Sequence, residues 1–140
     1  LGSSFFSAVR AWELNASLAS KQKLTWLSKE SQAFLKAEAE NRPLLIDFWA
    51  EWCTACKEMD HKTFGDKKVI EKLKEKNWLL LKLDLTSSND LTESLQKKYN
   101  IPGLPSLVLI PKGKNLSESL KLSGFVDSDK LIKTIDKLSL

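Results

Sequence analysis

Short runs of apolar residues alternate along this chain with stretches whose apolar residues recur at helical spacing. Runs of four to eight apolar residues are typical of strands that are buried on both faces. Strict alternation of apolar and polar positions is instead typical of a half-exposed edge strand. The segments predicted as strands, the last of them an edge strand, are Leu24–Leu27, Leu44–Ala50, Trp78–Leu85, Leu107–Ile110 and Leu120–Ser123.

Between these runs, residues that can cap a helix precede stretches with apolar residues three or four positions apart. Helices are predicted from Ser28 to about Asn41, from Cys53 or Thr54 to about Lys62, and from caps at Asp66, at Asn89 and at Asp127 or Ser128. Their expected inward residues are Val69, Ile70 and Leu73, then Leu91, Leu95 and Tyr99, and finally Leu131, Ile132, Ile135 and Leu138. Strands that alternate with helices predict an α/β domain whose parallel or mixed sheet is covered on both faces.

The first 23 residues do not fit this alternation. Phe5, Val9 and Trp12 fall at helical spacing, so residues 1–23 are predicted to be a tether or a short amphipathic helix. The basic start, apolar run and cleavage site of a signal peptide are not evident there. We therefore expect one domain over residues 24–140, preceded by this segment.

Composition argues against a disordered or fibrous protein. Apolar residues make up 42% and charged residues 29% of the chain, as in ordinary globular domains. No run of 18 apolar residues is present to span a membrane. The 22 basic and 18 acidic residues leave a charge of +4 that is spread along the chain. A nucleic-acid-binding protein usually concentrates its basic residues on one face, so we expect no nucleic-acid partner. We also expect the domain to be a monomer.

The two cysteines, Cys53 and Cys56, lie where a predicted buried strand gives way to a helix. In the first turn, unpaired backbone N–H groups and the helix dipole favour the thiolate of Cys53. Cys56 lies on the same helix face, so the pair is predicted to form a reversible, two-electron disulfide. A zinc site would need more ligands than these cysteines and His61, and an inert disulfide closing so short a loop would add little stability. We expect no metal, and no cofactor besides the Cys53–Cys56 disulfide.

Acidic residues surround this pair in the sequence. Asp47 is the only charged residue of Leu44–Ala50. Burial of its carboxylate would raise its pKa and allow it to exchange protons, unless it points to a wet edge as an ordinary surface acid. Glu58 and Asp60 follow within about one turn of Cys56, and their negative charge would raise the pKa of nearby thiols.

The residues around the cysteines resemble a known family. Asp47-Phe48-Trp49-Ala50-Glu51-Trp52-Cys53 resembles the approach to the active site of thioredoxins. Over residues 43–139 the chain is more similar to one branch, the C-terminal periplasmic domain of DsbD thiol:disulfide interchange proteins. The matching segments are Cys53-Thr54-Ala55-Cys56-Lys57-Glu58, Thr63-Phe64-Gly65-Asp66 with Val69, Gly103-Leu104-Pro105, and Gly124-Phe125. The departures are Trp49 where that branch often has Tyr, Asp60 where it can have Glu, and an extra Pro102.

The resemblance implies a thioredoxin-like α/β fold, a central mixed β-sheet flanked by helices. It implies that Cys53 is the exposed nucleophile and Cys56 the buried resolving thiol. It also implies a cis bond between Leu104 and Pro105, with Pro105 facing the disulfide and helping to hold a partner's chain. Leu104 and Trp52 would be further contacts to the partner, although a tryptophan beside the site can equally belong to the core.

By the same resemblance, the expected function is a disulfide reductase that relays electrons from a membrane-embedded donor domain to a periplasmic acceptor domain. The expected location is the periplasm, as a soluble domain of an inner-membrane protein. The acids Glu58, Asp60 and Asp47 favour a reducing potential of roughly −200 to −270 mV. The alternatives are a thioredoxin-like reductant for cytochrome c maturation, an oxidase or isomerase, and a non-catalytic thioredoxin-fold module that only binds a partner.

Overall fold

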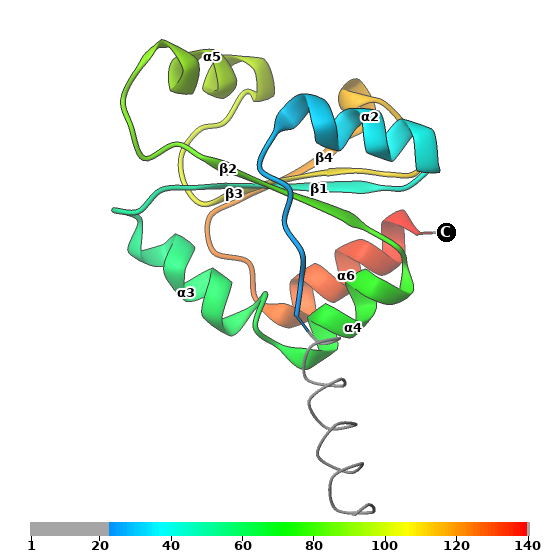
Figure 1. Ribbon diagram of the computed structural model, residues 1–140. Helices are drawn as coiled ribbons and strands as arrows, with labels where there is room; N and C mark the ends of the chain where they lie inside the picture. Colours follow the sequence, from blue (N-terminus) through cyan, green and yellow to red (C-terminus); the bar gives the residue numbers. More distant parts are fainter. Residues whose placement is uncertain (1–22, 140) are drawn as a thin grey trace, which may run out of the picture.

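The computed structural model describes residues 23–139 of the 140-residue chain. The predicted tether or short helix at residues 1–23 therefore lies outside the described residues, except for Lys23. In chain order (Figure 1), the elements are α2 (Glu30–Glu40), β1 (Leu44–Trp49), α3 (Thr54–Lys62), α4 (Lys67–Glu75), β2 (Leu79–Asp84), α5 (Asp90–Tyr99), β3 (Ser106–Ile110), the 3₁₀ turn η1 (Leu116–Glu118), β4 (Leu120–Ser123) and α6 (Ser128–Leu138). No helix within this described part has the length and apolar character of a membrane span.

The sheet is mixed, as predicted, with the strand order β2-β1-β3-β4. β1 pairs in parallel with β2 and antiparallel with β3, and β4 pairs antiparallel with β3. In β4, half-buried and exposed residues alternate, which confirms the predicted edge strand. β1 therefore lies inside the sheet, and it is the strand that leads directly into the two cysteines.

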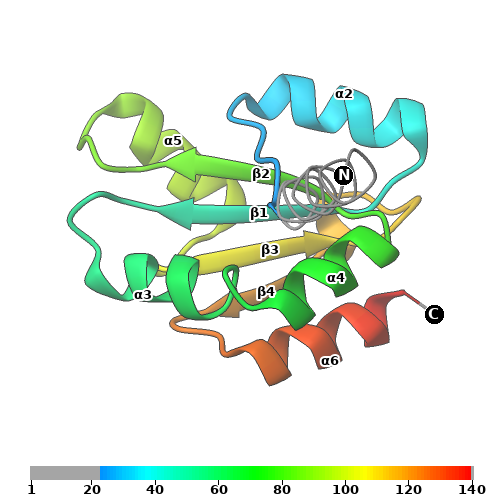
Figure 2. The ribbon, with the colours of Figure 1, turned by 60° about the horizontal axis from the view of Figure 1, so that its bottom comes forward.

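Helices cover both faces of the sheet. α2 and α5 lie on one face, and α3, α4 and α6 lie on the other (Figures 1 and 2). Because successive side chains of a strand point to opposite faces, Leu44, Ile46 and Phe48 pack beneath α2 and α5, whereas Leu45 packs on the opposite side. The same alternation directs Asp47 to the face that carries α3.

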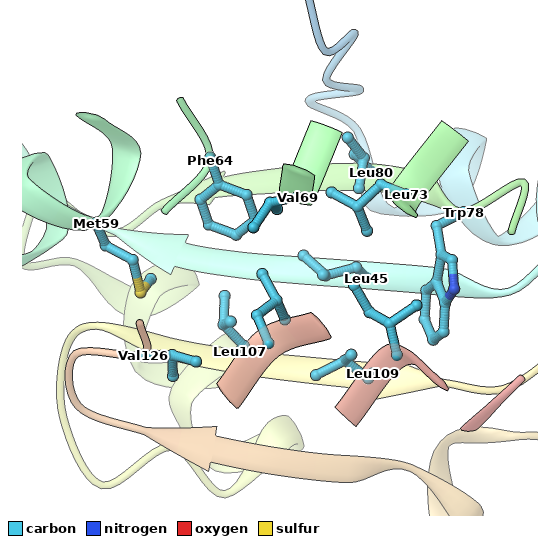
Figure 3. Close-up of a cluster of buried hydrophobic side chains, with 12 residues drawn as sticks. Leu45, Met59, Phe64, Val69, Leu73, Trp78, Leu80, Leu107, Leu109 and Val126 are labelled. Atoms are coloured by element: carbon cyan, nitrogen blue, oxygen red, sulfur yellow. The ribbon is translucent and has the colours of Figure 1, made fainter. Parts of the chain in front are cut away.

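Each face has its own hydrophobic cluster. On the side of α3, α4 and α6, strand residues such as Leu45 and Leu107 pack against Met59, Phe64 and Val69 (Figure 3). On the side of α2 and α5, the rings of Phe48 and Tyr99 lie 5.0 Å apart, centroid to centroid. Fully burying a large apolar side chain contributes about 1.5–3 kcal/mol, so these two clusters hold the helices against the sheet.

The predicted helix caps at Asp66, Asn89 and Asp127 are confirmed. Each side chain accepts a hydrogen bond from a backbone N–H group in the first turn, donated by Lys68, Thr92 and Lys130 respectively. A cap of this kind typically contributes about 1 kcal/mol, which explains why local sequence alone located these three helix starts.

The predicted first strand and first helix differ from the structure. Of Leu24–Leu27, only Leu27 pairs with the sheet, through a single parallel bridge to Leu81 of β2. The chain turns into α2 directly afterwards, and that helix begins at Glu30 rather than after Ser28. Its N-cap is Lys29, which makes no side-chain cap. Glu30 instead accepts hydrogen bonds from Lys98 and Tyr99 of α5, a tertiary contact that the local pattern could not reveal.

The predicted inner face of α5 is wrong at its first position. Leu91 is 69% exposed, whereas Tyr99 is fully buried and Leu95 is half-buried. Thr92 is buried in its place, and its hydroxyl donates a hydrogen bond to the carbonyl oxygen of Ser87. This bond turns the start of the helix so that Leu91 faces solvent.

Candidate active site

The two cysteines lie at the N-terminus of α3 and form a disulfide. Cys53 is the N-cap residue, with an extended backbone, and its N–H donates to the carbonyl oxygen of Ala50 at 3.1 Å. The N–H of Cys56 donates to Sγ of Cys53, also at 3.1 Å. Their Cα atoms are 5.2 Å apart, within the range that a disulfide needs. The predicted pair at a helix start is therefore present.

The two cysteines differ in their exposure to solvent. Cys53 is 7% exposed and Cys56 is 1% exposed. Cys53 is the more accessible of the two, but it is more deeply covered than its place at the helix start led us to expect. The covering side chains include Trp49, Ala55 and Leu104, which pack around both cysteines and Ala50.

The loop before β3 adjoins the cysteines. The Leu104–Pro105 bond is cis, as the resemblance implied, and Leu104 packs against the cysteine cluster. The carbonyl oxygen of Pro105 accepts a hydrogen bond of 2.8 Å from the N–H of Gly124. The Gly-Leu-Pro segment and the late Gly-Phe segment are thus brought together, although about 20 residues separate them in the chain.

A buried ion pair joins β1 to β2 on the α3 side of the sheet. Asp47 is only 1% exposed, and its cross-strand partner in the parallel register is Lys82. Nζ of Lys82 lies 3.8 Å from Oδ2 of Asp47. Neither carboxylate oxygen of Asp47 accepts a hydrogen bond within the described residues. Asp47 is therefore a buried acid, as predicted, and not a surface acid at a wet edge.

Asp60 completes this cluster from α3. Its Oδ2 accepts a hydrogen bond of 2.9 Å from Nζ of Lys82, so two carboxylates share one ammonium group. Burial raises the pKa of Asp47 from 3.8 to about 7. The positive charge of Lys82 opposes this rise, and the negative charge of Asp60 adds to it. Asp47 consequently changes its protonation near neutral pH.

The remaining predicted residues lie outside this cluster. Glu58 is exposed on α3, where its carboxylate is 4.0 Å from Lys62, and His61 is also exposed. Trp52 is 66% exposed, and its indole N–H donates to the carbonyl oxygen of Thr86 at 3.1 Å. Among residues 23–139, no group of three or more His, Cys, Asp or Glu side chains is arranged to hold a metal ion.

Sequence reasoning missed Lys82 and Trp26. Nζ of Lys82 lies over two tryptophan rings, 4.8 Å from the ring centroid of Trp26 and 5.5 Å from that of Trp49. A signal for Lys82 was present, because it is the only charged residue among the apolar positions 78–83, just as Asp47 is in its own strand. Two lone, opposite charges in neighbouring buried strands indicate a cross-strand pair.

Comparison with known proteins identifies the family. The family model described as Thioredoxin matches residues 25–137. The chain belongs to the thioredoxin family. Among solved structures, this thioredoxin domain is similar to chloroplastic thioredoxin z, with a TM-score of 0.63 and 23% identity over 83% of this chain and 94% of that one. That likeness concerns the fold, and it confirms the predicted fold class.

The resemblance to DsbD is also confirmed. The thioredoxin domain is 33% identical over 124 residues to the thiol:disulfide interchange protein DsbD of Campylobacter jejuni, covering 87% of this chain and 21% of that protein. The DsbD of Yersinia pestis is 36% identical over 97 residues, which cover 69% of this chain and 16% of that protein. The oxidised C-terminal domain of DsbD from Neisseria meningitidis has a TM-score of 0.62 and 25% identity over 81% of this chain and 99% of that one. The chain thus spans about a fifth of the length of the curated relatives that it matches.

Proposed function

We propose that this chain is a thiol:disulfide oxidoreductase domain that donates electrons to the disulfides of partner proteins. The observation that carries the proposal is the Cys53–Cys56 disulfide at the N-terminus of α3. A short disulfide at a helix start can open and close with little movement, and the helix end stabilises the thiolate that forms. Its relatives that are named thiol:disulfide interchange proteins support the same chemistry.

The proposed reaction proceeds by two thiol–disulfide exchanges. In the reduced domain, the thiolate of Cys53 attacks one sulfur of the partner's disulfide, forms a mixed disulfide and releases the partner's other sulfur as a thiolate. The thiolate of Cys56 then attacks Sγ of Cys53, which restores the Cys53–Cys56 disulfide and releases the partner's second thiolate. Two electrons pass to the partner, and its two thiolates take up two protons. We assign the first attack to Cys53 because it is the more exposed of the two cysteines.

Asp47, which is buried, and Asp60, which is half-buried, supply a means of handling these protons. Cys56 and Asp60 are four residues apart and share a face of α3, and Asp60 is joined through Lys82 to Asp47. A carboxyl group with a pKa of about 7 is close to half protonated at neutral pH, which suits it to accept the proton of the Cys56 thiol. In this proposal Asp47 is the proton acceptor, and Asp60 adjusts the charge around it. Glu58, which is exposed and faces Lys62, has at most a weak influence.

The charges near the cysteines support electron donation as the direction of flow. Asp47 and Asp60 place two carboxylates against one ammonium group on this side of the sheet, so the cluster disfavours additional negative charge. A strongly oxidising disulfide requires a highly stabilised thiolate, and these carboxylates oppose the stabilisation that the helix end provides. We therefore propose a reducing potential of roughly −200 to −270 mV.

The proposed partners are a membrane-embedded donor domain and a periplasmic acceptor domain, with Trp52, Leu104 and Pro105 contacting the bound partner.

Equilibration with glutathione buffers of graded potential tests the proposal. The oxidised and reduced fractions can be counted after acid quenching and alkylation, with the Cys53→Ser and Cys56→Ser variants as controls that cannot form the pair. A midpoint in the proposed range supports electron donation. A midpoint near about −120 mV would indicate an oxidase instead. A disulfide that millimolar thiol does not reduce would indicate a module that only binds its partner.

A further inference from the structure

A short extended segment ahead of α2 reaches the lysine of the redox site. The N–H of Leu27 donates to the carbonyl oxygen of Leu80 at 2.8 Å, and the N–H of Lys82 donates to the carbonyl oxygen of Leu27 at 2.9 Å. This segment is therefore attached to β2 at the backbone of Lys82 itself. The residue before the bridge is Trp26, which lies on the α3 side of the sheet and packs against the cluster of Figure 3.

The ring of Trp26 contacts both a hydrophobic partner and the ammonium group of Lys82. Its centroid is 5.0 Å from that of Phe64, and the two ring planes are almost perpendicular, at 87°. Phe64 is only 5% exposed, so it cannot move aside without disturbing the core. Nζ of Lys82 lies over the same ring, 4.8 Å from its centroid, which is close enough for a cation–π interaction.

Lysine has a flexible four-carbon side chain that usually extends its ammonium group into water. Here the side chain of Lys82 is only 22% exposed, and its ammonium group is directed to Asp47 and Asp60. Trp26 and Trp49 are the aromatic rings against which it lies. We propose that Trp26 is a positioning residue for the redox site, whose ring holds the Lys82 ammonium group between the two carboxylates.

The consequence for Asp47 has a definite sign. Lys82 from β2 and Asp60 from α3 are the charged groups that act on Asp47, and its partner in β3, Leu107, carries no charge. When Trp26 no longer holds the ammonium group, Lys82 spends more of its time in solvent and stabilises the Asp47 carboxylate less. The pKa of Asp47 then rises further above 7. This inference rests on the proposed role of Asp47, but it concerns an equilibrium that can be measured without any exchange reaction.

The test is a titration of Asp47 by the ¹³C chemical shift of its carboxyl carbon in the oxidised 140-residue chain, with Asp47→Asn to assign the signal. Trp26→Leu removes the aromatic ring but keeps an apolar side chain, whereas Trp26→Phe keeps a ring. We expect Trp26→Leu to raise the midpoint by about half a pH unit and Trp26→Phe to raise it less, because phenylalanine binds cations more weakly than tryptophan. A midpoint in Trp26→Leu that is unchanged or lower would overturn the proposal.

A matched control lies on the opposite face of the sheet. Phe34 of α2 has a similar contact with a lysine, since Nζ of Lys98 is 5.9 Å from its ring centroid. Phe34→Leu should therefore leave the titration of Asp47 unchanged. An equal shift in Phe34→Leu and Trp26→Leu would show a general loosening of the fold, and it would contradict the specific role of Trp26.

A double-mutant cycle with Lys82→Met decides whether Trp26 acts through the lysine. In the Lys82→Met background, replacing Trp26 with Phe or Leu should no longer change the midpoint, and an undiminished effect would overturn the proposal. If Trp26→Leu does not fold, as circular dichroism would show, the cycle with Trp26→Phe gives the same decision.

The proposed function is judged separately. If Asp47→Asn has the exchange rates of the wild type at every pH, the proton role of Asp47 is wrong, whatever the titrations show.

Discussion

Lys82 and Asp47 are cross-strand partners in the parallel pair of β2 and β1, and the Lys82 ammonium group lies 3.8 Å from a carboxylate oxygen of Asp47. The ammonium group is closer to Asp60, with which it forms a hydrogen bond of 2.9 Å. Asp47 is thus the more buried acid and the less well compensated one. Burial of the Asp47 carboxylate, which Lys82 offsets only in part, explains why the pKa of Asp47 rises to about 7. The same burial determines how replacement of Asp47 should change the stability of the domain.

Asp47→Asn should stabilise the oxidised domain in a pH-dependent way. Because the pKa is about 7 in the folded state and near 3.8 when unfolded, the folded protein alone retains this proton between about pH 4 and 7. The wild type therefore loses stability as the pH rises through that window, by up to about 4 kcal/mol. Urea unfolding should show Asp47→Asn to be the more stable protein near pH 8, with a difference that nearly vanishes at about pH 4.

Glu58→Gln is the matched control for this measurement, since Glu58 is an exposed acid on the neighbouring helix α3. It should change stability by less than about 0.5 kcal/mol at either pH. A stability difference between Asp47→Asn and the wild type that stays constant with pH would contradict the raised pKa of Asp47.

In the reduced protein, a bulky maleimide should label Cys53 before Cys56. The difference in exposure gives the order, because Cys53 is 7% exposed in the disulfide form whereas Cys56 is 1% exposed. Peptide mapping after brief labelling identifies the modified residue. In addition, Cys56→Ser should accumulate a mixed disulfide with a protein substrate, because the resolving attack is missing. Initial labelling at Cys56 would reverse the assignment of the two cysteines.

Trp52→Ala should weaken the reaction with protein disulfides while leaving the fold intact. Trp52 is 66% exposed and precedes Cys53 in the chain. Within residues 23–139, its indole N–H makes one hydrogen bond, to the carbonyl oxygen of Thr86. With insulin as the oxidised substrate, we expect KM to rise about fivefold with little change in kcat, as for a contact worth about 1 kcal/mol. Leu91→Ala is the control, because Leu91 is equally exposed but lies on α5. Equal effects of the two substitutions would remove Trp52 from the partner surface.

Gly65→Ala should destabilise the domain by about 1–3 kcal/mol, the usual cost of overpacking. A Cβ atom at position 65 would collide with the backbone carbonyl oxygen of His61, and a backbone atom cannot rotate away as a side chain can. Gly103→Ala is the matched control, because a Cβ atom there meets nothing within 4 Å. Thermal unfolding of the oxidised proteins compares the two, and equal melting temperatures would show that the turn after α3 adjusts freely.

Features that depend on nearby residues were predictable from the sequence. Asp66, Asn89 and Asp127 cap helices through hydrogen bonds that span two or three residues, so a short window contains the whole interaction. The burial of Asp47 was predictable for a similar reason, since its strand neighbours are all apolar. The raised pKa of Asp47 then follows from the cost of burying a charge.

Features that depend on pairing between distant segments were not predictable in this way. Lys82 was not recognised as part of the site because its proximity to Asp47 depends on the register of two strands 35 residues apart. The position of Trp26 next to Lys82 depends on the single bridge from Leu27 to Leu81. The local pattern predicted a complete strand there instead. Leu91 satisfied the helical spacing, but hydrogen bonds at Thr92 rotated the start of α5 away from it.

The Leu27 bridge also determines how the domain responds to mechanical force. When tension is applied through the chain ahead of residue 23, the load reaches the domain through the two backbone hydrogen bonds at Leu27 and through the packing of Leu24 and Trp26 on the hydrophobic cluster. These bonds break before the paired strands β2-β1-β3-β4 separate, because each of those strands is held by several bonds at once. Trp26 would leave Lys82 at the same moment. A pull on this segment is therefore expected to alter the charge balance around Asp47 while the sheet and the disulfide remain in place.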